Sequence, residues 1–255
     1  ALRQSELLPQ QLWDLGEGAP HLPLYNPYPP FELQHAVALQ ENATLPPWMP
    51  SWPRGFPLDY VQDARTRPPF GAPRATPAPP VHVVQLLADG DPDVDAIFRL
   101  TRPLPASFAR KREAALLPLD TYSPMNAQAC LFSRLAFWAL LLPVTVHGRV
   151  SDIWRSFTFT KLMQATGQAR AFASNYVIQE RNAHTILADL QAEEPLYELA
   201  GGLVAGLRRL RLNSSSLGDA MLELAVALYE VGVVEALDVQ LTQAWVSDLL
   251  SVGVA

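Results

Sequence analysis

Four aspartates occur within seven residues, at positions 89, 91, 93 and 95, directly after an apolar and β-branched run. The cluster contains Asp-x-Asp, a spacing by which carboxylate oxygens can hold a hard divalent cation. It is equally typical of an Asp-rich turn whose side chains bond their own backbone and cap a helix beginning at Ala96. Asp93 and Asp95 are the candidate binding pair, because acids on a rigid turn between strand and helix can hold sugar hydroxyls.

A second group of polar residues lies in His147-Gly-Arg-Val-Ser-Asp-Ile-Trp-Arg155. A carboxylate in the first turn of a helix is favoured by the helix dipole and stays ionised, so Asp152 is a candidate general base. Arg149 offers charge-assisted bonds to a phosphate, and Trp154 offers a ring face to a sugar. The alternative is a structural helix with an N-terminal Asp and a buried Trp.

Other polar residues carry weaker signals. Cys130 has no partner for an intrachain disulfide and stands in an apolar run, which favours a buried, inert thiol. Asn42 and Asn213 open Asn-x-Ser/Thr sequons, which would be glycosylated in a secretory lumen. Asn182 is expected to cap a helix. The sequence contains no Gly-rich phosphate loop, no nucleophile elbow and no Cys/His metal spacing.

Charge and hydropathy limit the classes of partner. The net charge is −6, and no Lys/Arg-rich run occurs, which disfavours nucleic acid as a partner. The longest apolar stretch, Leu135 to Val146, is 12 residues and contains a proline, so it is too short to cross a bilayer and is expected in the core. The chain has no signal-type start, so any membrane anchor is expected outside it.

Proline divides the chain, since 22 of its 24 prolines lie at or before Pro124. Long helices and central strands are therefore excluded from residues 1–80. Residues 1–62 are rich in aromatic residues and are expected to be irregular but packed. Residues 63–80 are predicted to form a Pro-rich linker or loop.

The rest of the chain alternates strand and helix and then becomes helical. Residues 81–87 predict a strand, residues 151–166 a helix capped by Ser151 and stopped by Gly167, and residues 171–179 a second strand. From residue 182 we expect one kinked helix or two, interrupted by Pro195, and then helices over 217–231 and 234–250. The predicted fold class is α/β, with domain regions 81–180 and 181–255, the latter helical.

Three ordered stretches resemble the STELLO-type glycosyltransferases: residues 89–101, residues 124–143 and residues 148–155. Residues 179–184 and 241–253 extend the resemblance, which runs from about Arg54 to the end. The plant members are Golgi-resident, membrane-anchored and associated with cellulose synthase complexes. The resemblance therefore implies a Golgi-luminal glycoprotein region that is part of a membrane-anchored protein and acts in polysaccharide or glycan synthesis.

A more distant similarity is to the reversibly glycosylated polypeptides, which are UDP-arabinopyranose mutases of glycosyltransferase-A fold. It rests on residues 55–58, 92–96, 124–126 and 149–154. It implies that residues 81–180 form the acceptor side of such a domain, where Asp152 faces the acceptor. The Mn²⁺ or Mg²⁺ ligands of that fold would lie upstream of Ala1, so this stretch would lack the nucleotide and metal half and be inactive alone.

Two functions are consistent with these residues and with the resemblance. The first is a glycosyltransferase that uses a nucleotide sugar and a glycan acceptor. The alternative is a non-catalytic scaffold that binds a polysaccharide synthase, such as cellulose synthase, and helps deliver it. The resemblance assigns Asp152 as the catalytic residue and gives substrate contacts to Asp93, Asp95, Asn126, Arg149 and Trp154.

Overall fold

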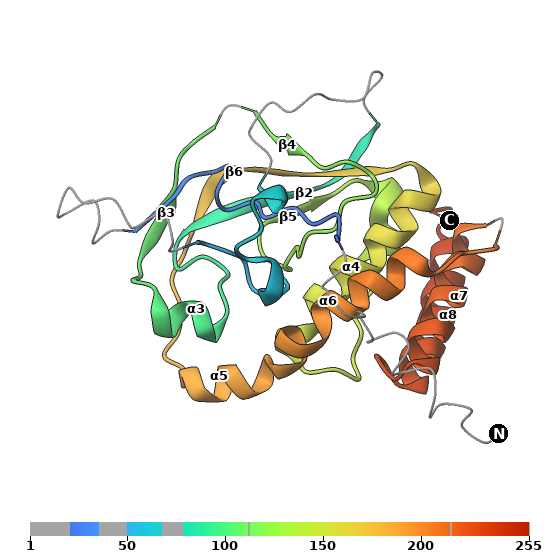
Figure 1. The fold of residues 1–255 in the computed structure, drawn as a ribbon. Helices are drawn as coiled ribbons and strands as arrows, with labels where there is room; N and C mark the ends of the chain where they lie inside the picture. The colour runs from blue at the N-terminus through green and yellow to red at the C-terminus, as the bar shows by residue number, and fades with distance from the viewer. Residues whose placement is uncertain (1–20, 36–49, 68–78, 112, 215, 255) are drawn as a thin grey trace.

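The computed structural model describes residues 21–35, 50–67, 79–111, 113–214 and 216–254. Within these ranges the strands form one mixed sheet in the order β1-β3-β2-β6-β4, with β5 also paired to β2 (Figure 1). The strands are β1 (Leu33–His35), β2 (Val81–Gly90), β3 (Ala106–Phe108), β4 (Ala115–Leu116), β5 (Cys130–Phe132) and β6 (Ala169–Gln179).

The two long strands, β2 and β6, lie parallel at the centre of the sheet. The other side of β2 pairs with β5 near its start and with β3 at its end. Figure 1 shows α4, α5 and α6 on one side of these strands, and α7 and α8 as a pair at one end. The helices are α3 (Ala96–Thr101), α4 (Gly148–Thr166), α5 (Ile186–Ala192), α6 (Glu194–Arg209), α7 (Leu217–Glu230) and α8 (Ala236–Ser251), with 3₁₀ turns η1 (Leu58–Tyr60), η2 (Ala64–Thr66) and η3 (Arg134–Leu140).

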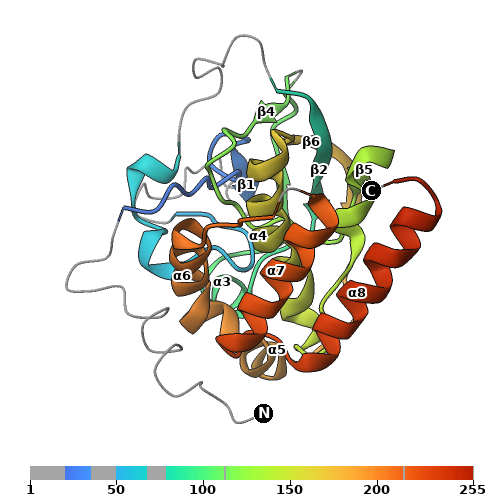
Figure 2. The same cartoon turned by 90° about the vertical axis from the view of Figure 1, so that its right-hand side faces the viewer.

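These elements confirm the predicted α/β class and the helical C-terminal part. The strand expected over 81–87 is β2, and the strand expected over 171–179 is β6. Pro195 separates α5 from α6, because a proline fits the first turn of a helix but not its interior. The last two helices, α7 and α8, form a hairpin whose members run side by side (Figure 2).

The Pro-rich segment before β2 has little regular structure but contributes much of the core. Within 21–35 and 50–67, regular elements are limited to β1, η1 and η2. Its aromatic side chains are nonetheless buried in one cluster with residues of α4, α6 and α7: Tyr25, Tyr28, Phe31, Trp52, Phe56 and Tyr60. Apolar burial of this size fixes the segment without a repeating backbone pattern.

Two predicted helix starts are wrong. Helix α4 begins at Gly148, and the side chain of His147 caps it by accepting from the Arg149 N–H at 3.1 Å, so Ser151 lies inside the helix. Its end at Gly167 is confirmed, with that residue left-handed at φ 66°. Asn182 caps no helix, because α5 starts after Thr185.

The apolar stretch 135–146 contains most of η3 and is only partly buried. Ala136, Trp138 and Ala139 face the core, whereas Leu135 is 60% exposed. In a 3₁₀ turn the side chains repeat every three residues, so only part of a continuous apolar run can face inward. Among the residues that the structure describes, no helix is both long and apolar enough to cross a membrane.

Candidate functional site

Arg54 lies between two aspartates that are distant in sequence. Its Nε and Nη2 donate to the two oxygens of Asp93 at 2.9 and 3.0 Å. Its Nη1 and Nη2 donate to the two oxygens of Asp152 at 3.1 and 2.9 Å. Burial opposes the charge of Arg54, but the two carboxylates outweigh it and hold its pKa above the ordinary value. We call Arg54, Asp93, Asn126 and Asp152 the Arg54 cluster.

The fold brings the two acids together at one edge of the sheet. Asp93 follows the carboxyl end of β2, and α4, which leads into the parallel strand β6, starts at the same edge. Ligand sites in α/β sheets commonly lie outside the carboxyl ends of parallel strands. The sequence between β2 and α3 therefore presents Asp93 to the N-terminal part of α4. Asp152 lies there just after the first turn, so the prediction that it belongs to the first turn is wrong, because the helix starts at Gly148.

Gly55 allows Arg54 to approach α4. It has a φ of +79°, and a Cβ at this position would lie 2.4 Å from Ile153 Cγ2. Only glycine has both the left-handed freedom and the small volume that this contact requires. The Arg54 N–H also donates to the Asp93 carbonyl at 2.9 Å, so backbone and side chain are fixed together.

Asn126 extends the cluster toward β2. Its Nδ2 donates to Asp93 Oδ2 at 2.9 Å, and its Oδ1 accepts from Gln85 Nε2 at 2.7 Å and from the Gln128 N–H at 2.9 Å. Because a carboxylate only accepts, these partners fix the orientation of both amides. Asn126 is thus held rigidly, as a residue that positions a ligand would be.

Asp152 is the most engaged member of the cluster. One oxygen accepts from Arg54 Nη1 and from the Ile153 N–H at 3.0 Å, and the other accepts from Arg54 Nη2 and from the Ala127 N–H at 3.0 Å. Its side chain is 12% exposed and lies beside exposed Ala127. Four donors occupy about the four lone-pair sites that a carboxylate offers.

Asp95 is separate from the Arg54 cluster and has a structural partner on each oxygen. It caps α3 by accepting from the Phe98 N–H at 2.7 Å, as the Asp-rich turn interpretation predicts, and it accepts from Trp52 Nε1 at 2.6 Å. Burial raises its pKa to about 6, and the nearby charges of Glu193 and Asp93 add to this rise against the two hydrogen bonds.

Arg149 points to a second set of acids rather than to Arg54. Its guanidinium binds the fully buried Glu193 through Nε at 2.7 Å and also through Nη2, and Nη1 lies 3.2 Å from Asp189 Oδ1. Glu193 further accepts from Tyr197 Oη at 2.6 Å and from the Ala96 N–H at 2.8 Å. This set ties the start of α4 to α3, α5 and α6.

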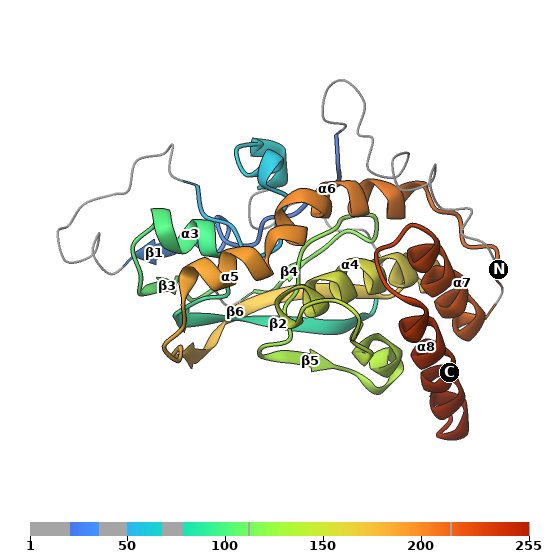
Figure 3. The same ribbon diagram turned by 90° about the horizontal axis from the view of Figure 1, so that it is seen from below.

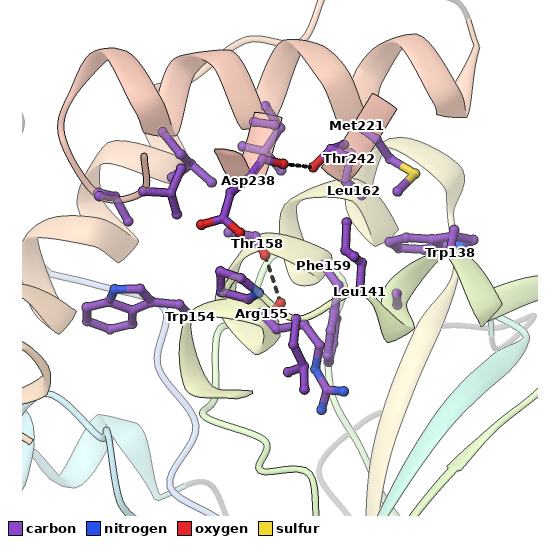
Figure 4. Close-up of a pocket in the computed structure, with 18 residues that line it drawn as sticks. Trp138, Leu141, Trp154, Arg155, Thr158, Phe159, Leu162, Met221, Asp238 and Thr242 are labelled. Atoms are coloured by element: carbon purple, nitrogen blue, oxygen red, sulfur yellow. Dashed lines mark hydrogen bonds between the residues drawn. The ribbon is translucent and has the colours of Figure 1, made fainter. Parts of the chain in front are cut away.

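Trp154 is buried on the side of α4 that faces α7 and α8. It is 3% exposed, and it helps to line a largely apolar cavity of about 90 Å³ between η3, α4, α7 and α8 (Figure 4). It also lines a second cavity at the start of α4. Trp154 therefore faces these two cavities and is otherwise buried, so it does not offer an exposed ring face.

Arg155, one turn after Asp152, was not singled out from the sequence. It is 5% exposed, its Nε has no hydrogen-bond partner, and its Nη2 has one long contact of 3.5 Å to the Asn126 carbonyl. Burial lowers its pKa, against the opposing influence of Cys130 and Asp152. Cys130 itself donates to the Asn126 carbonyl at 3.1 Å, and burial raises its pKa to about 12.

Two further predicted positions are the asparagines of the glycosylation sequons. Asn213 is exposed, and its Nδ2 donates to Glu223 at 3.2 Å. Asn42 lies outside the described residues. In the parts of the chain that the structure describes, no group of three or more His, Cys, Asp or Glu side chains is arranged to hold a metal ion.

The structure thus brings together Asp93, Asn126 and Asp152 and places Asp95, Arg149 and Trp154 around them in other environments. Sequence reasoning missed Arg54, Gln85, Arg155 and Glu193. Arg54 had one available signal, because it directly precedes the Gly55-Phe-Pro-Leu58 stretch of the distant similarity. The others carry no local pattern.

Comparison with known proteins supports the resemblance. Residues 149–255 match the model of the STELLO glycosyltransferases. The chain is 29% identical over 211 residues to STELLO2 of Arabidopsis thaliana and 28% identical over 212 residues to STELLO1 of the same plant, both described as probable glycosyltransferases. Each alignment covers 79% of this chain and 26% of the relative, so the chain spans about a quarter of their length.

The resemblance to the STELLO glycosyltransferases is confirmed, and the chain is glycosyltransferase-like in sequence. The family match begins at Arg149, at the start of α4, and includes Asp152 and Arg155.

Proposed function

We propose that this chain contributes the acceptor side of a glycosyltransferase that moves a sugar from a nucleotide sugar to a glycan acceptor in polysaccharide or glycan synthesis. The observation that carries the proposal is the Arg54 cluster. Three separate stretches that resemble the family meet there, through Asp93, Asn126 and Asp152. Buried charges that converge on one edge of a sheet are more typical of a site than of a core.

In this proposal Asp152 is the catalytic base or the acceptor anchor. It lies near the start of α4, just after the first turn, beside exposed Ala127, where an acceptor hydroxyl can approach. Since each of its oxygens already accepts two hydrogen bonds, an incoming hydroxyl must replace one donor before a proton can be transferred. If Arg54 is the donor that is replaced, it stays beside Asp152, because its hydrogen bonds to Asp93 are kept.

The other predicted residues take supporting roles. Asp93 and Asn126 position Asp152 through Arg54 and contact the sugar, whereas Asp95 and Arg149 fix the neighbouring loop and helix. Trp154 would contact a sugar only from its cavities. A divalent cation, Mn²⁺ or Mg²⁺, would accompany the diphosphate of the donor, held by ligands from sequence before Ala1, and the protein would work in the Golgi lumen.

Donor binding tests the proposal most directly. The full-length protein and residues 1–255 would each be titrated with UDP- and GDP-sugars in the presence of Mn²⁺, and thermal unfolding would be followed, since a ligand that binds the native state raises the midpoint. We expect a metal-dependent rise with one donor for the full-length protein. Folded protein that responds to none of these donors would contradict the proposal.

Substitution of Asp152 tests the assigned residue. Asp152→Asn should lower transfer by about a hundredfold or more, which is the usual contribution of a general base. Asp238→Asn is the matched control, because Asp238 is also buried and accepts from the Val144 N–H at 2.7 Å, far along the chain from the cluster. Equal transfer by wild type and Asp152→Asn would remove Asp152 from the mechanism.

A second candidate function is a scaffold that binds and helps deliver a polysaccharide synthase. The observation that favours it is the saturation of Asp152, whose four donors make it a structural anchor as the cluster stands. A scaffold would show no donor response, and Asp152→Asn would still bind the synthase in a pull-down of the two purified proteins.

A further inference from the structure

Arg155 places a positive charge in the protein interior, and no acidic side chain in the part of the chain that the structure describes binds it. Among the described residues, its guanidinium has the long contact to the Asn126 carbonyl and a position 5.5 Å from the centre of the Phe132 ring. A buried charge without a paired charge and without full hydrogen bonding is strongly unfavourable. A ligand that carries negative charge would compensate it.

Other arginines near this edge of the sheet are paired. Arg54 binds Asp93 and Asp152, Arg99 lies 2.5 Å from Asp91, and Arg149 binds Glu193. Arg155 therefore differs from its neighbours although it lies one turn from Asp152 on α4. Asp152 does not fill the gap, since its oxygens are directed to Arg54 and to two backbone N–H groups.

The guanidinium of Arg155 points away from the apolar cavity. In Figure 4 its nitrogens are turned away from Asp238 and Thr242 of α8. The head group lies instead beside Phe132 of β5 and the Asn126 carbonyl. Cys130 supplies no anion there, because burial keeps its thiol neutral.

Gln85, which also contacts Asn126 and is paired with Cys130 of β5 in the sheet, provides a second unpartnered atom. Its Nε2 is committed to Asn126 Oδ1, and its buried Oε1 has no partner. Since Asn126 Nδ2 is committed to Asp93, the amide of Gln85 cannot be reversed, and Oε1 must be an acceptor. An unpaired donor on Arg155 and an unpaired acceptor on Gln85 thus flank Asn126.

We propose that Arg155 and Gln85 form a subsite for an oxyanion that carries a neighbouring hydroxyl. Arg155 would bind the anionic oxygens through its planar fork, and Gln85 Oε1 would accept from the hydroxyl. Two ligands share this chemistry: the phosphate of a sugar nucleotide and the carboxylate of an acidic sugar. The choice between them rests on the proposed function, whereas anion binding itself does not require transfer.

Nuclear magnetic resonance on the intact chain tests the subsite without a substitution that endangers folding. The ¹⁵N-labelled protein would be titrated with pyrophosphate, UDP and glucuronate at constant ionic strength, and the Nε–H resonances of arginine would be followed. The Arg155 resonance is assigned by its loss in Arg155→Lys. We expect it to shift saturably with at least one of the three anions, while the Arg54 resonance shifts less.

The pattern of response names the source of the anion. A response to pyrophosphate and UDP supports a donor phosphate, and a response to glucuronate supports an acidic sugar. No response of Arg155 to any of the three, or equal shifts of all arginines, would overturn the subsite. A protein that binds these anions but transfers no sugar would retain the subsite and contradict only the enzymatic function.

Affinity in variants provides an independent measurement. Arg155→Gln should weaken the responding anion by about tenfold or more, as expected for the loss of charge-assisted bonds. Lys161→Gln is the matched control, because it removes a half-buried positive charge from the same helix, and it should change the affinity less than twofold. Equal losses of anion affinity in both variants would show that the effect depends on net charge alone, and this would overturn the subsite. If Arg155→Gln does not fold, Arg155→Lys should show a smaller loss in the same direction.

Discussion

Arg54 is linked to Asn126 through Asp93, and Arg155 contacts the Asn126 carbonyl, but the surroundings of the two arginines differ in one respect. Arg54 is bound by two carboxylates, whereas Arg155 has none among the described residues. Both side chains are buried, so burial alone does not tell their roles apart. The comparison teaches that Arg54 joins segments of the fold, while Arg155 keeps hydrogen-bonding capacity for something outside the chain.

Among the substitutions that test this contrast, removal of Arg54 should change the unfolding free energy most. Arg54→Met leaves Asp93 and Asp152 buried without a cation, and breaking a buried pair in this way costs about 3 to 5 kcal/mol of unfolding free energy. Urea denaturation followed by circular dichroism would measure the change. Arg65→Gln is the control, because Arg65 is 63% exposed and its bond to Asp63 is a surface pair, which contributes little to stability. Similar losses in both variants would contradict the role of Arg54.

The pKa of Asp95 gives the second effect. Because the folded-state pKa, about 6, is above that of the unfolded chain, the native state holds the proton more tightly. The contribution of Asp95 to stability is full below about pH 4 and is lost as the pH rises through 6, by about 2 to 3 kcal/mol in total. Asp95→Asn should remove this part of the pH dependence of the unfolding free energy between pH 4 and 7. Parallel pH curves for both proteins would disprove the shift.

Arg155→Met should have the smallest effect, and in the opposite direction from Arg54→Met. Replacing a buried, unpaired cation by an apolar side chain of similar length removes a desolvation penalty, so unfolding free energy should stay the same or rise by about 1 kcal/mol. Thermal and urea unfolding in buffer without phosphate or carboxylate would measure it. A loss of 3 kcal/mol or more would make the two arginines equivalent and remove the contrast.

Local patterns predicted what depends on neighbours in sequence. The strand β2, the cap that Asp95 provides for α3 and the end of α4 at Gly167 all follow from residue types within a few positions. The helix starts were less predictable, because His147 took the capping role through its ring nitrogen. The family resemblance indicated Asp93, Asn126 and Asp152 as members of one candidate site.

Residues that act across the fold were not predictable in the same way. Arg54 meets Asp93 and Asp152 over separations of 39 and 98 residues, and Glu193 meets Ala96 over 97 residues. No periodicity or spacing encodes such contacts, since they depend on how the irregular segment before β2 packs on α4. The missing partner of Arg155 is likewise a property of its three-dimensional surroundings.

The reach of Arg54 also has a practical consequence for dissecting the molecule. A fragment that begins at β2 would retain the whole stretch that matches the family, together with Asp93, Asn126 and Asp152. It would lose Arg54, and with it the cation between the two acids, as well as the aromatic residues that complete the core. A cut at the start of β2 would thus destabilise the rest of the fold, and any assay of activity or synthase binding should keep the proline-rich segment attached.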